Sequence, residues 1–500
     1  MTEPVDAVGR VETRGIDYIP KAERHASPWN LFWILIGGDL AFSLIVFGWL
    51  PVSFGLDFWQ SGWAIIVGNL IGALILAPMS LFGPRTGTNN SVSSGALFGV
   101  VGRIIGSVLA LFSALGFVAL AVWTGGQAMA AGLAKLADVD VQPWMLAVSY
   151  AAIVCVVVGI AVLGHANLVL ANKFMVPAVG VMLLIGVVVL APQFTGGVSG
   201  NYLLGSFVPT WVLAVITVAS VAVSYGPFVG DWSRYVPRSA SPRKLLLATG
   251  SGAFIGLTVT CLFGAFTASM FVDPATDYVL GLTDVAPGWY AVPILLIGLI
   301  GGCGQGAIGL YGTGLDFSSL VPRLSRVAAT LTIAAVATAL VYIGTFVVDA
   351  VSLINAFVVI LLVITTPWMV IMIEGFIYRR GLFHPADLQV FNEGRAGGRY
   401  WFTGGVNYRA VCAWVPGVIV GLLFTATTVF TGPLAAVAGG MDLSFILSGV
   451  VAGVVYAAVL KVAPEPPAIR GTSFGSLTAR DGSTVPEDGE DATLIGEMSA

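Results

Sequence analysis

The sequence predicts an all-α polytopic membrane protein with twelve transmembrane helices, and its composition is the first reason. The 500-residue chain is 57% hydrophobic and 10% charged, whereas a soluble domain is about 45–50% apolar and about 25% charged. A soluble protein of this length must cover its surface with polar groups, a requirement that a lipid bilayer removes. The sequence has no basic stripe of the kind that binds nucleic acid, so we expect the bilayer to be its surroundings and no nucleic acid to be its partner.

Hydropathy is the second reason, because a bilayer-spanning helix needs about 20 mainly apolar residues. Twelve segments meet this requirement: 29–52, 60–82, 104–132, 144–163, 174–191, 208–230, 246–270, 289–315, 328–347, 353–377, 410–431 and 442–461. The stretch 83–103, which is rich in Gly, Ser and Asn, leaves open a partly helical connection between the second and third segments.

The distribution of charge is the third reason. When both termini are placed in the cytoplasm, every Lys and Arg except Lys135 falls in an inner connection or terminus, as the positive-inside rule requires. The outer connections instead carry Asp57, Asp138, Asp140, Asp273, Asp277, Asp284, Asp349 and Asp442. Because a missed or extra span would scramble this alternation, we expect a multi-pass protein of the inner (plasma) membrane with both ends inside.

Two spans contain residues that interrupt helices. The first span contains Gly37-Gly38-Asp39, and the sixth contains Tyr225-Gly226-Pro227. Paired glycines and Gly-Pro weaken the helical hydrogen-bond ladder, and transporters built from inverted repeats bind their substrate at such breaks. The alternative is that membrane helices are rich in glycine everywhere, so that these glycines carry no special meaning. The matched positions of the two breaks favour a five-plus-five inverted-repeat transporter core with broken helices one and six, plus two extra helices.

This hypothesis divides the chain into six parts. They are a cytoplasmic N-terminal segment (1–27), a first repeat of spans one to five (28–192), a second repeat of spans six to ten (208–378), a cytoplasmic loop (379–409), spans eleven and twelve (410–461) and a disordered acidic cytoplasmic tail (462–500).

Asp39 is the first candidate for a functional residue. A carboxylate at the centre of a membrane helix costs about 2.5–3.5 kcal/mol on the insertion scale, so we expect it to face a polar cavity beside Gly37 and Gly38. There it could accept a hydrogen bond from the substrate, bind a cation or carry a proton. The alternative role is to cap the second half of the broken helix.

Aromatic and amide side chains form the rest of the candidate site. Trp123 and Gln127 are spaced i, i+4 and so project from one face of the third span. A ring that stacks and an amide that binds polar edges suit a flat heterocycle, although a lone Trp is often a packing residue. Tyr225 and Gly226 at the second break, and Gln305 in the eighth span, are the matching features of the second repeat.

Charged residues at the inner ends of two spans have a different predicted role. Asp231 and Arg234 lie at the end of the sixth span, and Glu374 lies near the end of the tenth. We interpret them as gating or structural ion pairs.

Enzymatic and channel functions are not supported by the sequence. The four cysteines lie alone in apolar runs (Cys155, Cys261, Cys303 and Cys412), and no His, Cys or carboxylate cluster has the spacing of a metal or catalytic site. We therefore expect no enzyme activity, no metal and no cofactor. A repeated filter loop of the kind found in channels is also missing from the sequence.

Three motifs resemble the nucleobase–cation symporter family, and within it the purine–cytosine permease branch. They are residues 15–24 (GIDYIPKAER), 83–87 (GPRTG) and 225–237 (YGPFVGDWSRYVP). The resemblance implies alternating access, a base bound by Trp123 and Gln127, and Tyr225 stacked on the opposite face of the ring.

Two positions depart from the family pattern. Members that bind nucleobases often carry Asn where this chain has Gly309, and some carry Asn in the broken first span where this chain has Asp39. The expected function is cation-coupled import of cytosine, a purine or a related flat heterocycle. Allantoin, hydantoins, vitamin-like heterocycles and, on the same fold, amino acids remain alternative substrates.

A proton is the expected coupling ion, with sodium the less favoured alternative. The resemblance implies that sodium-coupled relatives bind the ion between backbone carbonyls of span one and two hydroxyls of span eight. The corresponding stretch 301–304 has no hydroxyl, so a hard cation loses two oxygen ligands. Asp39 lies across the expected site and offers a protonatable group instead.

The topology can be tested by cysteine-accessibility labelling on a background that lacks the four native cysteines. A cysteine in 271–288 should be labelled from outside intact cells, whereas one at position 390 should be labelled only after permeabilisation. Labelling of position 390 in intact cells would overturn the predicted orientation.

Overall fold

The computed structural model describes residues 16–163, 165–320, 325–346, 350–427, 430–439 and 441–469. Most of the predicted tail 462–500 and the first half of the predicted segment 1–27 lie outside these ranges. Within them the protein is helical, and its only extended pairings are two isolated bridges, Thr403 with Val406 and Ala426 with Thr431.

Twelve groups of helices account for the predicted spans. In chain order they are α1 (Trp29–Asp39) with α2 (Phe42–Ser53), α3 (Phe58–Leu76), α7 (Ile104–Ala137), α8 (Pro143–Leu163), α9 (His165–Leu190), α10 (Phe207–Ser224) with α11 (Val229–Ser233), α12 (Pro242–Ala268), α14 (Ala291–Leu320), α15 (Arg326–Phe346), α16 (Ala350–Tyr378), α18 (Tyr408–Phe424) and α19 (Ser444–Val462).

Length and hydropathy support this count within the described residues. Ten helices can cross a membrane by themselves, and the bent pair α1–α2 makes an eleventh span. The twelfth is α18, an apolar helix of 17 residues. It ends at Phe424 rather than near residue 431 as predicted, because Thr425 adopts an extended conformation and a turn follows it.

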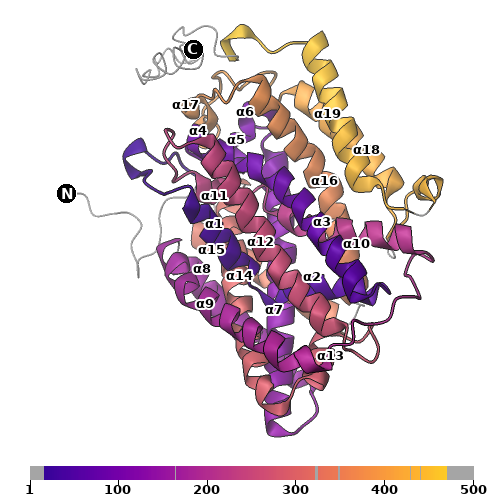
Figure 1. Cartoon of the computed structure of the whole chain (residues 1–500). Coiled ribbons are helices and arrows are strands. Elements are labelled where there is room, and N and C mark those ends of the chain that lie inside the picture. The colour runs from indigo at the N-terminus through magenta and orange to yellow at the C-terminus, as the bar shows by residue number, and fades with distance from the viewer. Residues whose placement is uncertain are drawn as a thin grey trace.

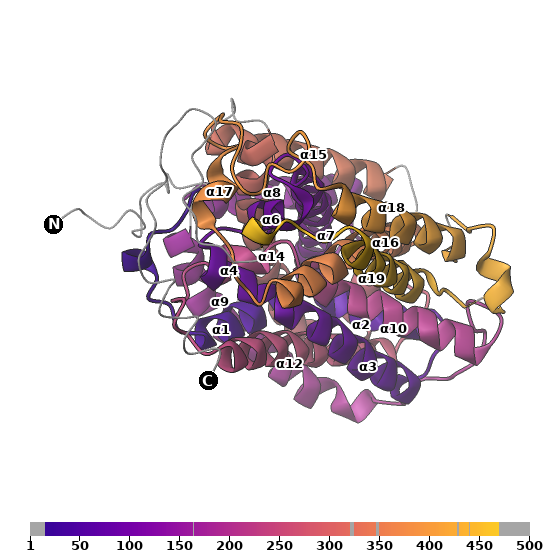
Figure 2. The same ribbon diagram turned by 90° about the horizontal axis from the view of Figure 1, so that it is seen from above.

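The pairing of spans follows the symmetry of an inverted repeat. The most extensive contact joins α7 to α14, which are the third helices of the two repeats, and α1 packs on α12 as α10 packs on α3. If the two repeats are exchanged, the contact of α7 with α14 maps onto itself. The contact of α1 with α12 maps onto the contact of α10 with α3. The last two helices, α18 and α19, pack on each other and on α16 at the outside of the bundle (Figures 1 and 2).

Glycines allow the crossings to be close. A Cβ on Gly48 of α2 would lie 1.8 Å from the carbonyl oxygen of Cys261. A Cβ on Gly264 of α12 would lie 1.9 Å from the carbonyl oxygen of Ile45. The backbones of α2 and α12 therefore touch at this crossing. Small residues drive association in lipid, where burial of apolar surface between helices gives no advantage.

Short helices form the connection after α3. The stretch 83–103 is partly helical: α4 (Phe82–Thr86) runs into it, and α5 (Asn90–Ser93) and α6 (Gly95–Phe98) lie within it. This connector lies at the end of the bundle that also carries residues 16–28, 379–407 and 463–469, called here the basic end. The opposite end carries α13 (Tyr278–Val285) (Figure 1).

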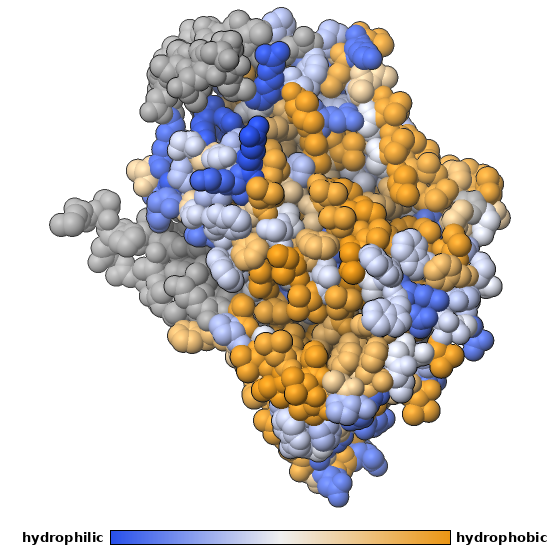
Figure 3. Space-filling model, in the orientation of Figure 1, coloured by the Kyte–Doolittle hydropathy of each residue, from blue (hydrophilic) through white to orange (hydrophobic). Residues whose placement is uncertain are grey.

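The outer surface between the two ends is apolar. Trp33, Trp59, Leu184 and Val188 are each at least 65% exposed, and apolar residues dominate the middle of the face that Figure 3 shows, with hydrophilic residues toward both ends. In water such a surface would favour aggregation. It is the surface that a bilayer covers.

Replacing Gly48 by Ala should destabilise the protein, because the added methyl group would collide with the backbone of α12. Overpacking typically costs about 1–3 kcal/mol, so we expect a lower melting temperature in detergent. Gly159→Ala is the matched control, since a Cβ there meets nothing within 4 Å. Equal melting temperatures for the two variants would contradict the close crossing.

Candidate functional site

The first span breaks at Leu40 and Ala41. Helix α1 ends at Asp39, α2 begins at Phe42, and their axes are bent by 66°. Ala41 is extended, with φ −127° and ψ 148°, which interrupts the helical hydrogen-bond ladder. The break therefore places the carboxyl group of Asp39 in the interior of the bundle.

The sixth span is interrupted but not sharply bent. Helix α10 ends at Ser224 and α11 begins at Val229, although together they count as one span, Phe207–Ser233. Pro227 has no N–H to donate. The Val223 carbonyl oxygen, which Pro227 cannot serve, accepts from the Gly226 N–H at 2.9 Å, and Nδ2 of Asn90 donates to the carbonyl oxygen of Gly226 at 2.7 Å.

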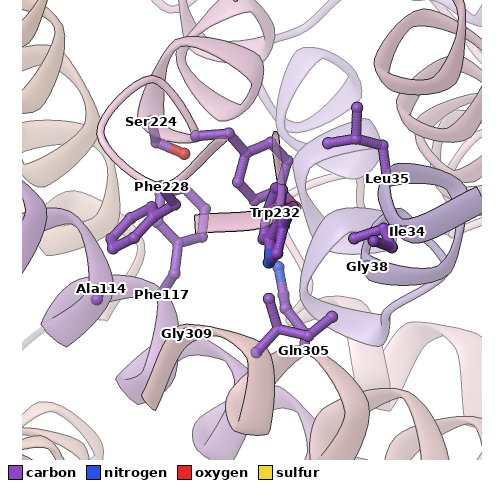
Figure 4. Close-up of a pocket in the computed structure, with 12 residues that line it drawn as sticks. Ile34, Leu35, Gly38, Ala114, Phe117, Ser224, Phe228, Trp232, Gln305 and Gly309 are labelled. Atoms are coloured by element: carbon purple, nitrogen blue, oxygen red, sulfur yellow. The ribbon is translucent and has the colours of Figure 1, made fainter. Parts of the chain in front are cut away.

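A pocket lies between these two breaks and α14. Ile34, Leu35 and Gly38 line one side of it, and Phe117 and Phe228 lie on the other side (Figure 4). The remaining lining residues are Ala114, Ser224, Tyr225, Trp232, Gln305, Ile308 and Gly309. Aromatic rings with few polar groups are the usual lining of a site for a small flat molecule.

Asp39 and Tyr225 join the two breaks. The Tyr225 hydroxyl donates to Oδ1 of Asp39 at 3.0 Å, and the carboxyl group is fully buried. The other oxygen, Oδ2, has no hydrogen-bond partner and faces the backbone of α12 at Gly256, where a Cβ would lie 2.6 Å from it. Asp39 does not itself line the pocket, but its partner Tyr225 does.

Gln305 makes the second polar contact across the break. The Ser43 hydroxyl in α2 donates to Oε1 of Gln305. This bond occupies the amide oxygen. The amide nitrogen, Nε2, makes no hydrogen bond and is therefore available as a donor. The Gln305 side chain points from α14 into the pocket (Figure 4).

Trp123 and Gln127 lie outside this pocket. Trp123 is 7% exposed and packs within the apolar core. Gln127 lies nearer the opposite end, where its Nε2 contacts Oδ2 of Asp277 at 3.5 Å. Burial raises the pKa of that Asp277 carboxyl above its ordinary value. The role predicted for the pair in binding substrate stays a prediction.

The other predicted residues lie partly in the pocket and partly outside it. Gly38 and Gly309 line it, whereas Gly37 does not, and Gly226 packs against Met369, whose sulfur would lie 2.5 Å from an added Cβ. Glu374 lies against α19, where a Cβ on Gly453 would be 2.6 Å from its Oε1.

Asp231 and Arg234 are both buried at the basic end, on and beside α11. Their predicted ion pair stays a prediction, and sequence reasoning missed what surrounds them. Asn89 in the connector donates to Asp316 of α14 at 3.0 Å, and both side chains are fully buried. A Cβ on Gly312 would lie 3.2 Å from Oδ2 of Asp231, so α11, α14 and the connector meet at one polar junction.

The three sequence motifs meet at this same end of the bundle. The Ile19 N–H donates to the Gly87 carbonyl oxygen at 2.9 Å. The Arg24 guanidinium donates to the Pro84 carbonyl oxygen at 3.2 Å. A Cβ on Gly83 would lie 2.5 Å from the backbone nitrogen of Arg234. The described part of the first motif (16–24) and the motifs 83–87 and 225–237 therefore lie in contact with one another.

Comparison with known proteins identifies the family. The family model described as "Permease for cytosine/purines, uracil, thiamine, allantoin" matches residues 18–448. The chain belongs to this permease family. The predicted resemblance is confirmed, and the protein is a membrane permease and not an enzyme.

Two named proteins are similar to this chain in sequence. The "Putative purine-cytosine permease YxlA" of Bacillus subtilis (strain 168) is 27% identical over 462 residues, which are 90% of this chain and 96% of that protein. The "Vitamin B6 transporter TPN1" of Saccharomyces cerevisiae is 30% identical over 136 residues, 26% of this chain and 23% of that protein.

Solved structures of similar proteins confirm the fold. Mhp1, a nucleobase-cation-symport-1 family transporter, in a closed conformation with bromovinylhydantoin bound, has a TM-score of 0.69 at 20% identity, covering 91% of this chain and 97% of its own. A Na+-coupled sialic acid symporter has a TM-score of 0.57 at 13% identity, with 89% and 92% covered.

Phe117, Phe228 and Trp232 are pocket residues of the permease that the sequence analysis did not single out. Phe228 and Trp232 fall inside the quoted motif 225–237 and follow Tyr225 by three and seven residues, a spacing that places them on one helical face. That spacing was the signal that could have found them.

The predicted platform can be tested by substitution. Trp123→Ala should abolish binding of a transported base and Trp123→Phe should retain part of it, because stacking contributes about 0.5–1.5 kcal/mol beyond burial. Gln127→Ala should weaken binding without preventing membrane insertion. The lipid-facing Trp144, which is 66% exposed, provides the control Trp144→Ala.

Melting temperatures of the same variants separate a binding defect from a packing defect, since Trp123 is buried. Uptake equal to that of the wild type in both Trp123→Ala and Gln127→Ala would exclude these residues from the site.

Proposed function

We propose that this permease imports a nucleobase or a related flat heterocycle across the plasma membrane by proton symport and alternating access. The buried bond between Asp39 and Tyr225 is the observation that carries the proposal. It joins a carboxyl group in the break of span one to a side chain that lines the pocket.

The substrate class follows from the lining of the pocket. Phe117, Phe228, Trp232 and Tyr225 supply aromatic faces, and Gln305 supplies an amide. A planar ring with polar edges satisfies both. The description of the family, which names cytosine, purines, uracil, thiamine and allantoin, supports the same class.

The chemistry of span eight supports a proton over sodium. A Cβ on Gly301 would lie 3.3 Å from the Leu40 carbonyl oxygen, so the stretch 301–304 faces the break of span one. It contains no hydroxyl, and a site there would offer a hard cation too few oxygen ligands. The Thr313 hydroxyl lies farther along α14 and donates to the Gly309 carbonyl oxygen at 2.6 Å.

A carboxyl group that binds a proton can do the work of a bound sodium ion. Ionisable residues at membrane depth are rare and mark proton relays in pumps and transporters. Asp39 is fully buried, and Tyr225 is the hydrogen-bond partner of its Oδ1. It can hold a proton during the inward movement of a neutral base and release it afterwards.

The pocket extends from the level of the two breaks toward the basic end, because it includes Ile34 of α1 and Trp232 of α11. We assign the basic end to the cytoplasm, in agreement with its arginines. The pocket is then the inner vestibule, and Trp123 and Gln127 bind the substrate on the other side of the breaks. Passage between the two sites is the alternating-access step.

The function can be tested with purified protein in proteoliposomes. Uptake of radiolabelled cytosine, hypoxanthine, uracil, allantoin, a hydantoin, pyridoxine and thiamine is measured under an imposed pH gradient without sodium. We expect accumulation of one or more of them. Amino acids should not compete, because Asp39 would repel their carboxylate.

The variant Asp39→Asn should abolish accumulation while permitting exchange, since the amide keeps the hydrogen-bonding shape but cannot carry a proton. Asp57→Asn is the matched control, because Asp57 caps α3 at the opposite end and Asn is an equally good cap. Uptake that requires a sodium gradient and ignores the pH gradient would refute proton symport.

A further inference from the structure

Two polar contacts lie on either side of the break in the first span. Asp39 is the last residue of α1, and Ser43 is the second residue of α2. Tyr225 donates to Asp39 at 3.0 Å, Ser43 donates to Gln305, and Tyr225 and Gln305 both line the pocket. One half of span one thus contacts span six, and the other half contacts span eight.

We infer that the Tyr225 hydroxyl is the element that couples proton binding to substrate binding, by reversing its hydrogen-bond polarity toward the pocket when Asp39 takes up a proton. The inference rests on the proposed function and adds the residue that carries the coupling. It follows from the rule that a carboxylate only accepts hydrogen bonds, whereas a carboxylic acid also donates one.

When Asp39 is ionised, the Tyr225 O–H must point at it, as it does in the structure. The hydroxyl can then offer only its oxygen lone pairs to the pocket, where Tyr225 is a lining residue. A substrate atom that accepts hydrogen bonds, such as a carbonyl oxygen or an unprotonated ring nitrogen, then receives no hydrogen bond from Tyr225.

When Asp39 is protonated, its own O–H can donate to the Tyr225 oxygen. The Tyr225 O–H is then free to rotate toward the pocket and donate to the substrate. One proton from solution binds the carboxyl group, and the phenol keeps its own proton throughout. Substrate binding and proton binding favour each other by the same factor, as linkage requires.

Among the described residues, Tyr225 is the titratable neighbour of Asp39 that also lines the pocket. In the described part of the chain, the titratable groups facing Asp39 are Tyr225 and Cys261 of α12. The Cys261 thiol donates to the Leu44 carbonyl oxygen at 3.4 Å and does not line the pocket. Gly256 occupies the remaining side, against Oδ2.

Gln305 supplies a second hydrogen-bond donor that selects the substrate, beside the Tyr225 hydroxyl. Ser43 holds its Oε1, so Nε2 is a donor at every pH. The Gln305 amide is therefore a permanent donor, and the Tyr225 hydroxyl is a donor that depends on the proton. It fits a heterocycle with at least two hydrogen-bond acceptors, and a ring that offers only donors should not bind more tightly at low pH.

A measurement without ligand tests the switch directly. Infrared difference spectra of the purified protein between high and low pH should contain a protonated-carboxyl band and a tyrosine C–O band that titrate together. Asp39→Asn should remove both bands, and Tyr225→Phe should remove the tyrosine band. Tyr290→Phe is the control, because this buried hydroxyl donates instead to the Met182 carbonyl oxygen at 2.8 Å.

Binding of cytosine provides the second test. Wild-type affinity should rise by up to about tenfold for each unit of falling pH while one linked proton binds. Tyr225→Phe, which keeps the ring, should hold the weak affinity at every pH. Ser43→Ala should weaken binding but keep the pH dependence, because it frees only Gln305.

The outcomes separate this inference from the proposed function. Uptake driven by a pH gradient that persists in Tyr225→Phe would overturn the role of the hydroxyl and leave proton symport intact. A tyrosine band that survives in Asp39→Asn would also overturn it. Coupled infrared bands in a protein that accumulates no base under a pH gradient would support the switch and refute the proposed function.

Discussion

Every polar backbone group inside a bilayer must find a partner within the protein, and this constraint determines where the permease can build a binding site. An interrupted helix exposes N–H and C=O groups that lipid cannot satisfy. The breaks at Leu40–Ala41 and at 225–228 occur where other spans cover them. Asn90 satisfies the Gly226 carbonyl oxygen, and Tyr225 binds the carboxyl group at the end of α1. Of these groups, Tyr225 also lines the pocket, so the second break contributes directly to the candidate site.

Much of the fold could be predicted from local sequence. Spans follow from runs of about 20 apolar residues, and breaks follow from Gly37-Gly38 and Gly226-Pro227, because both signals lie within single segments. The pairing of repeats was predictable only in outline, through the matched breaks. Where α18 ends was not, since the apolar run continues beyond Phe424 while the backbone turns at Thr425.

For the site, the sequence pointed to some polar residues but not to their contacts. Tyr225 and Gln305 line the pocket, and their predicted role in binding substrate stays a prediction. Ser43 could not be found, since its contact with Gln305 joins residues 262 positions apart. Trp123 shows the limit of spacing arguments: the rotation of α7 against its neighbours, not the i, i+4 pattern, decides what the ring touches.

The central claim is that one proton accompanies each neutral base, and a reversal-potential measurement tests it most directly. Proteoliposomes are given a fixed cytosine gradient, and the membrane potential at which net flux stops is recorded at several pH gradients. One coupled proton predicts a shift of about 59 mV per pH unit, the value for a single charge, and no shift with sodium. A reversal potential that follows the sodium gradient and is indifferent to pH would contradict the claim.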